Sequence, residues 1–104
     1  MPTTTIAGHA VEVNDEGFLT VPEEWTEELA PALAAQIGIT LTDRHWEVLR
    51  FLRADFAETG ETATLRRTSS RSDVPVKELF ALFPQKPAKK MAYIAGLPKP
   101  HGCV

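Results

Sequence analysis

The chain has 104 residues, which is enough for one hydrophobic core but not for two. Hydrophobic residues make up 43% and charged residues 24%, as in ordinary globular domains, and no apolar run approaches the ~20 residues that span a bilayer. The N-terminal sequence lacks the basic and apolar regions of a secretory signal, so none is expected. A single cysteine excludes an intrachain disulfide, and a cytoplasmic location is therefore expected.

The net charge of −3 is unevenly distributed along the chain. Residues 1–60 carry 11 acidic and 3 basic side chains, whereas residues 61–104 carry 3 acidic and 8 basic ones. One interpretation is that both halves are ordinary solvated surface. The other is that the basic half, which also contains Cys103, docks against an acidic partner or a phosphate backbone.

The N-terminal region predicts β-structure. Residues 4–19 alternate apolar and polar side chains in short runs. Gly8 and the stretch NDEG at 14–17 supply residues that are typical of tight turns. This pattern favours a small β-hairpin or meander.

A helix is predicted over residues 20–37, ending before Gly38. Thr20 followed by Glu23 fits a capping box, and Pro22 falls in the first turn. Pro31 is expected to kink or divide the helix, because it removes an interior hydrogen bond. An apolar face at helical spacing contains Trp25, Leu29 and Leu33.

The clearest helical pattern covers residues 41–60. Thr42 is a good N-cap, and Gly60 fits the left-handed residue that follows a last turn. We interpret His45 as a core histidine bound to a backbone carbonyl rather than as a catalytic base, because it lies on an apolar face. The other members of that face are Val48, Leu49, Leu52 and Phe56.

The next region is less regular. Residues 61–72 are polar apart from Leu65 and fit either a short helix or a loop. A helix capped by Ser72 or Asp73 is expected over residues 74–83. Its inward face would comprise Val76, Leu79, Phe80 and Phe83.

A last helix is predicted from Pro87 to Ala95, where Gly96 ends it. The fold class is therefore mainly α with a small N-terminal β-hairpin (α+β). We expect a helical bundle with a helix-turn-helix-like middle and a flexible C-terminal arm. Residues 1–95 would form a single domain, and residues 96–104 would form the arm that carries the reactive cysteine.

The predicted arm, GLPKPHGCV, contains the single cysteine at its next-to-last position. Pro98 and Pro100 fix their φ angles, so the arm is stiffer than a Gly/Ser linker. Free cysteine is usually buried, whereas a chain terminus is usually exposed. Cys103 is thus either a surface thiol without a role or a presented, reactive thiol, and we favour the second interpretation.

The reactivity of Cys103 depends on the fraction of the thiol present as thiolate. The C-terminal carboxylate disfavours a second negative charge, and Lys99 and His101 oppose it. His101 lies on the same side of an extended chain as Cys103, although a solvated residue without a role is the alternative. No cofactor or metal is expected, because one cysteine and three scattered histidines lack zinc-site spacing.

The C-terminal sequence FPQKPAKKMAYIAGLPKPHGCV resembles the end of the TusE/DsrC family of sulfur-relay proteins, which includes the gamma protein of dissimilatory sulfite reductase. GITLTDRHWEVLRFLR at 38–53 and DEGFL at 15–19 also resemble this family. The dissimilatory branch has a second cysteine at the position of Ala92, so the chain is similar to the single-cysteine, TusE-like branch. The segment between Arg66 and Phe80 is shorter and more polar than is usual in the family.

The resemblance implies a cytoplasmic sulfurtransferase that acts as a covalent carrier. Cys103 would take sulfane sulfur as a persulfide from an upstream sulfur-relay complex of the TusBCD or DsrEFH type. It would pass the sulfur to an acceptor such as a tRNA 2-thiouridylase, in 2-thiolation of the tRNA wobble uridine. The alternative pathway is dissimilatory or oxidative sulfur metabolism. Candidates for partner docking are Arg66, Lys89, Lys90 and Lys99.

A helix-turn-helix nucleic-acid-binding module over residues 43–83 is the alternative from another class. It would use the basic half of the chain. It leaves Cys103 without a role, and the net charge of the chain is negative. We therefore expect neither direct nucleic-acid contact nor membrane association.

Overall fold

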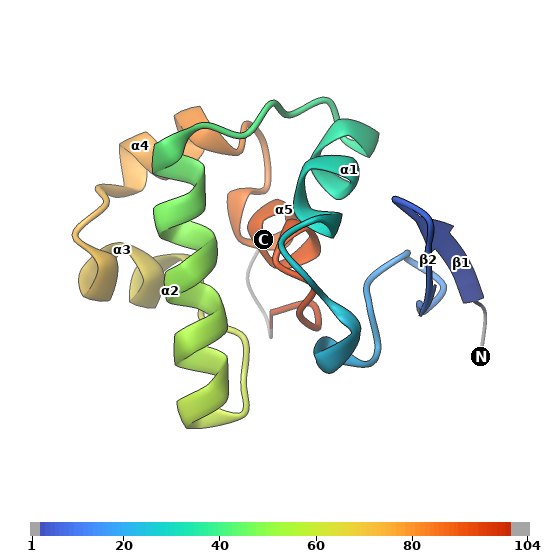
Figure 1. The fold of residues 1–104 in the computed structure, drawn as a ribbon. Helices are drawn as coiled ribbons and strands as arrows, with labels where there is room; N and C mark the ends of the chain where they lie inside the picture. The colour runs from blue at the N-terminus through green and yellow to red at the C-terminus, as the bar shows by residue number, and fades with distance from the viewer. Residues whose placement is uncertain (1–2, 101–104) are drawn as a thin grey trace.

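The computed structural model describes residues 3–100. These residues form two strands, one 3-10 helix and five α-helices: β1 (Thr3–Ile6), β2 (His9–Glu12), η1 (Pro22–Glu24), α1 (Leu29–Gln36), α2 (Asp43–Thr59), α3 (Leu65–Ser72), α4 (Val76–Leu82) and α5 (Pro87–Ile94). Helix α5 is central and packs against α1, α2 and α4, while the hairpin lies beyond α1 (Figure 1). The predicted fold class is confirmed. Within the described residues, no helix is long and apolar enough to cross a membrane.

The N-terminal hairpin follows the predicted turn residues. Strands β1 and β2 are antiparallel with Ile6 opposite His9, so Ala7 and Gly8 form a two-residue turn. Both turn residues have positive φ angles, 51° and 83°, as a type I′ turn requires. In the NDEG turn, the side-chain oxygen of Asn14 accepts hydrogen bonds from the backbone nitrogens two and four residues later, at 2.9 and 3.0 Å.

The helical structure predicted over residues 20–37 is divided, but the prediction that Pro31 divides or kinks it is wrong. The helical structure is interrupted at residues 25–28, between η1 and α1. Pro31 is the third residue of α1, where its missing N–H has no partner within the helix to lose. The predicted capping box is also absent, because Val21 rather than Thr20 precedes η1 and no side chain caps it.

Helix α2 has the predicted termini, with Thr42 as N-cap and Gly60 left-handed at a φ of 76°. The Nδ1 atom of His45 accepts a hydrogen bond from the backbone nitrogen of Thr42 at 3.0 Å. Its Nε2 atom therefore carries the hydrogen and donates a hydrogen bond to the carbonyl oxygen of Leu82 at 2.8 Å. The prediction of a core histidine bound to a backbone carbonyl is confirmed, and His45 joins α2 to α4.

The polar stretch after α2 forms a short helix over its last eight residues, while residues 61–64 form a connection. Helix α3 begins after Thr64, whose hydroxyl accepts a hydrogen bond from the backbone nitrogen of Arg67 at 3.1 Å. Asp73 does not cap the next helix as predicted, but ends α3 with a φ of 61°. A three-residue connection, residues 73–75, then leads to α4, which gives the predicted helix-turn-helix-like middle.

Helix α4 buries less of its surface than predicted. Leu79 and Phe83 are fully buried, whereas Val76 and Phe80 are 40% and 48% exposed. These two exposed residues are four apart and share the outer face of the helix. Helix α4 has only seven residues, and one of its faces packs against the core. The position of a side chain on the helix, rather than its hydrophobicity, decides whether it is buried.

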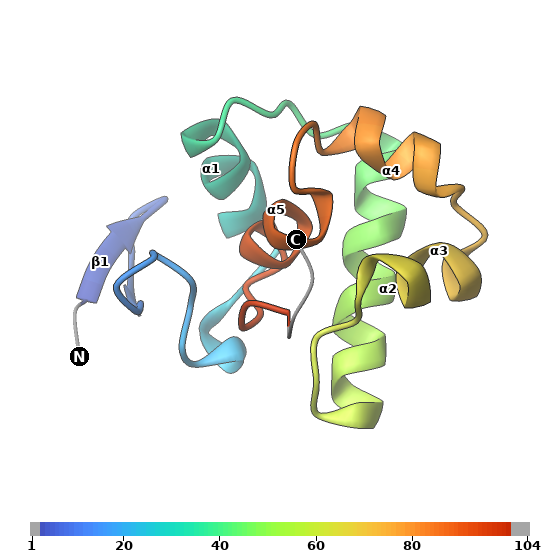
Figure 2. The ribbon, with the colours of Figure 1, turned by 180° about the vertical axis from the view of Figure 1, so that it is seen from behind.

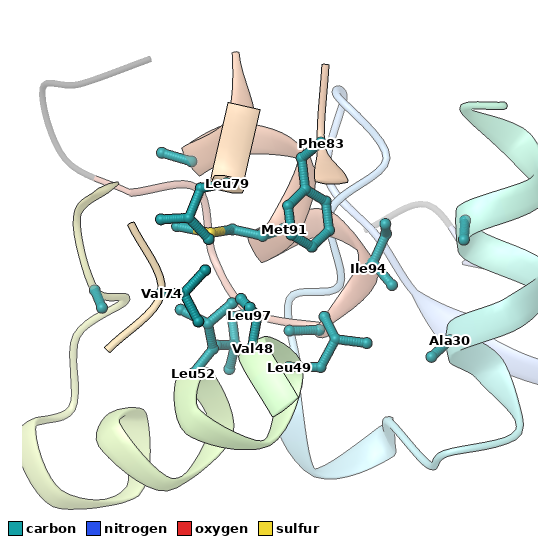
Figure 3. Packing of buried hydrophobic residues seen from close by; sticks show 14 residues of the cluster. Ala30, Val48, Leu49, Leu52, Val74, Leu79, Phe83, Met91, Ile94 and Leu97 are labelled. Atoms are coloured by element: carbon teal, nitrogen blue, oxygen red, sulfur yellow. The ribbon is translucent and has the colours of Figure 1, made fainter. Parts of the chain in front are cut away.

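The main hydrophobic core lies between α2, α4 and α5 (Figure 3). Leu97, from the segment predicted as an arm, is 1% exposed and belongs to this core. A second cluster packs the hairpin against α1 through Ile6, Val11, Val13, Leu19, Leu29 and Leu33. The described residues that follow α5 thus fold back beside this helix (Figure 2).

Candidate functional site: the root of the C-terminal segment

The predicted reactive residue Cys103 and its neighbour His101 lie outside the described residues. Residues 96–100, which we call the root segment, are described. The site is therefore defined by how the domain holds the residues that lead to Cys103.

The end of α5 fixes the direction in which the root segment leaves the helix. The backbone nitrogen of Leu97 donates to the carbonyl of Ala92 at 3.0 Å, and that of Gly96 donates to the carbonyl of Tyr93 at 3.3 Å. This pair of bonds is a Schellman motif, with Gly96 left-handed at a φ of 70°. A Cβ at Gly96 would lie 2.3 Å from the ring of Trp25, so no larger residue fits without movement.

Two side chains from distant elements bind the last carbonyl groups of α5. The indole nitrogen of Trp25 donates to the carbonyl of Ile94 at 2.9 Å. The guanidinium of Arg53 donates to the carbonyl of Ala95 at 3.1 Å and to that of Pro22 at 3.0 Å. The guanidinium also lies 4.5 Å from the centroid of the Trp25 ring. Partial burial of the Arg53 side chain lowers the pKa of Arg53. Sequence reasoning assigned Trp25 to the core and missed Arg53, which has no local signal.

The root segment is also held beyond Leu97. The hydroxyl of Thr62, in the connection between α2 and α3, donates to the carbonyl of Pro98 at 2.7 Å. Lys99 is exposed, with its ammonium 3.4 Å from a carboxylate oxygen of Glu16. Pro100 is buried. Contacts from the loop after the hairpin, the residue after η1, helix α2 and the connection after α2 therefore converge on residues 94–99.

Lysine side chains gather next to the root segment. The Glu16 carboxylate lies 3.3 Å from the ammonium of Lys89 as well as 3.4 Å from that of Lys99, and hydrogen bonds to these two groups lower the pKa of Glu16. Lys90 donates to the carbonyl of Pro84. Beside them is a cavity of about 290 Å³, which we call the lysine cavity, lined by Glu16, Phe18, Ile37, Lys86, Lys89, Lys90 and Tyr93.

Arg66 is not part of this group. It is exposed on α3 and lines a separate cavity with Thr64, Arg67, Ser70 and Arg71. Arg67 in turn is bound to the buried carboxylate of Asp55 at 2.8 Å. Among residues 3–100, no three His, Cys, Asp or Glu side chains are grouped closely enough to hold a metal ion.

This fold and site define a class of protein: a small helical α+β domain that fixes the root of a C-terminal segment containing one cysteine. The family model for DsrC-like proteins matches residues 5–104, and the chain belongs to this family. Sulfurtransferase TusE of Yersinia pseudotuberculosis is 40% identical, with 93% of this chain and 96% of the relative covered. Sulfurtransferase TusE of Salmonella typhimurium is 38% identical, with 93% and 95% covered.

Solved structures show the same fold. The oxidised gamma-subunit of dissimilatory sulfite reductase (DsrC) from Archaeoglobus fulgidus superimposes with a TM-score of 0.82 at 38% identity, covering 99% of this chain and 100% of that one. DsrC of Allochromatium vinosum gives a TM-score of 0.84 at 33% identity, covering 98% and 97%. The resemblance stated from the C-terminal sequence is confirmed along the chain.

Proposed function

We propose that the protein is a sulfurtransferase that works as a covalent sulfur carrier, with Cys103 as the residue that bears the sulfur. The observation that carries this proposal is that the end of α5 and the root segment, shortly before the only cysteine of the chain, are anchored to the domain. Relatives named Sulfurtransferase TusE, similar over nearly the whole length, support it. The fixed root would limit the region that the thiol can reach, and partner proteins would supply the remaining catalytic groups.

The chemistry needs no external oxidant or reductant. The Cys103 thiolate attacks the outer sulfur of a donor persulfide, the donor S–S bond breaks, and the donor leaves as a thiolate. Cys103 then holds the outer sulfur as a persulfide, which is a reversible thiol modification. In the second step an acceptor nucleophile attacks this outer sulfur, and the Cys103 thiolate leaves unchanged.

We further propose that the acceptor pathway is 2-thiolation of the tRNA wobble uridine in the cytoplasm. A TusBCD-like complex would act upstream and a tRNA 2-thiouridylase downstream. Support comes from the names of the relatives and from Ala92, which is fully buried where the dissimilatory branch has its second cysteine. Dissimilatory or oxidative sulfur metabolism is the alternative, and it would use the same carrier chemistry.

The test is sulfur loading in vitro. The protein is incubated with a cysteine desulfurase, cysteine and an upstream relay protein, and its mass is measured. We expect the added mass of one sulfur atom, located on the peptide containing Cys103 and removed by dithiothreitol. Cys103→Ser is the control and should accept none. If no competent donor adds sulfur, or if Cys103→Ser still transfers sulfur to an acceptor, the carrier proposal is wrong.

A further inference from the structure

We propose that the lysine cavity is the docking site for an acidic surface segment of the sulfur-donating protein. An apolar side chain of that segment would enter the cavity, and flanking carboxylates would bind the lysines at its rim. This inference rests on the carrier function proposed above, and it names the surface and the chemistry by which the donor is recognised.

The shape and floor of the cavity favour a side-chain anchor. Its volume of about 290 Å³ lies at the lower end of the range for small-molecule sites, which suits one inserted side chain better than an organic cofactor. Phe18 is buried, and its ring meets that of Tyr93 edge-on with centroids 5.6 Å apart. The Tyr93 hydroxyl donates to Gln36 at 2.8 Å, so the aromatic floor is held in place. An apolar floor with a charged rim is typical of the centre of a protein–protein interface.

The charge at the rim selects an acidic partner. Lys86, Lys89 and Lys90 line the cavity, and Glu16 is the one acidic residue among its described lining. The Glu16 carboxylate already lies between the ammonium groups of Lys89 and Lys99, so the rim keeps a positive charge. The partner we infer is a protein rather than RNA, because the whole chain has a net charge of −3, which disfavours the approach of a polyanion.

The lysine cavity lies next to the root segment. Glu16 belongs both to the cavity lining and to the ion pair with Lys99 of the root segment. A donor bound in the cavity would therefore lie beside the residues that lead to Cys103. Charge attraction at such a site acts mainly on the association rate, so it should matter most when the donor is scarce.

The experiment measures the rate of sulfur loading at limiting donor concentration and low salt. The test variant is Lys86→Glu/Lys90→Glu. The matched control is Lys77→Glu/Arg71→Glu, which changes the net charge equally at two exposed residues of α3 and α4. Ile37→Ser, at the cavity wall, tests the apolar contact without changing charge. Thermal unfolding checks each fold, and alkylation of Cys103 by iodoacetamide checks that the thiol itself is unaffected.

We expect the test variant to load at least tenfold more slowly, the control within twofold of wild type, and Ile37→Ser several-fold more slowly, all with unchanged alkylation. Equal slowing in both charge variants, or none in the test variant, would overturn the inference. A short oligoribonucleotide is also added to the reaction. If it inhibits sulfur loading of the wild-type protein but not of the test variant, the cavity binds phosphate and the inference is overturned. A wild-type protein that accepts no sulfur would instead contradict the carrier function itself.

Discussion

Gly96 shows how strongly a single residue constrains the root segment. Its φ of 70° disfavours any side chain, and a Cβ would lie 2.3 Å from the Trp25 ring. Gly38 has a similar φ of 74°, but no atom lies within 4 Å of its ideal Cβ. Substituting each glycine by alanine therefore separates two free-energy costs. Both variants have the cost of a left-handed alanine, and only the variant at Gly96 has the cost of a steric clash.

We expect Gly96→Ala to lower the free energy of unfolding by about 2–4 kcal/mol, because a left-handed alanine and an overpacked contact both cost energy. Gly38→Ala, which has only the first of these costs, should lose about 1–2 kcal/mol. Urea denaturation of the two variants measures both values. Equal losses would mean that the Trp25 ring moves aside without cost.

The acid dependence of Glu16 tests the contacts around the lysine cavity. Its pKa is lowered from 4.5 in the folded chain, because Lys89 and Lys99 bind the charged carboxylate. A lowered carboxylate pKa stabilises the fold above the unfolded value and loses this contribution as the pH falls through the folded value. In Lys89→Gln/Lys99→Gln, NMR titration of the Glu16 carboxyl carbon should show the pKa rising toward 4.5. An unchanged pKa would mean that these ion pairs do not form in solution.

At the scale of elements, local signals predicted local structure. Thr42, Gly60 and Gly96 mark helix ends through the conformation of their own backbone, and the structure has them where the sequence predicts. The errors arise where distant packing decides. The helix predicted over 20–37 is interrupted at Trp25, whose indole binds a carbonyl 69 residues away.

The same reason explains which parts of the site could be predicted. The cysteine and the proline-containing segment are evident in the sequence, because their chemistry is local. The side chains that hold the end of α5 and the root segment are not, since Arg53 and Thr62 act on carbonyls 42 and 36 residues further along the chain. The sequence also predicted docking lysines from charge alone, and whether they dock a partner stays a prediction.

A truncation series tests where the proposed arm begins. Ending the chain after Pro100 keeps the described contacts of the root segment, so the free energy of unfolding should change by less than ~1 kcal/mol. Ending it after Gly96 also removes the buried Leu97 and should cost about 3 kcal/mol or more. Thermal unfolding should show the second loss as a fall of more than ~10 °C in Tm. A similar Tm for both chains would support an arm that begins at residue 96.

For the whole molecule, the main consequence is that a single cysteine follows a segment that the domain holds in place. The chain has a single cysteine, and the end of α5 and the root segment that lead to it are held by contacts from four parts of the fold. The proposed donor and acceptor must therefore approach the same end of the protein. They should bind in turn rather than together.

An unreactive donor should accordingly inhibit the hand-over of sulfur. When the carrier is loaded with sulfur and mixed with the acceptor, a donor protein whose own reactive cysteine is replaced by serine should slow the transfer. Added acceptor should overcome this inhibition, because the two proteins compete for one surface. Single-turnover transfer measured over a range of both concentrations checks this. Inhibition that excess acceptor cannot relieve would indicate separate binding surfaces.

The burial of Pro100 sets a limit on the shape of these partners. Only two residues lie between Pro100 and Cys103, the proposed sulfur-bearing residue, and the three extended residue steps from Pro100 to Cys103 span at most ~10 Å. A carrier anchored in this way cannot deliver sulfur to the bottom of a deep channel unless the partner also receives part of the domain. Its partners should therefore have their reactive cysteine in a shallow depression, with a surrounding rim shaped to accept this end of the protein.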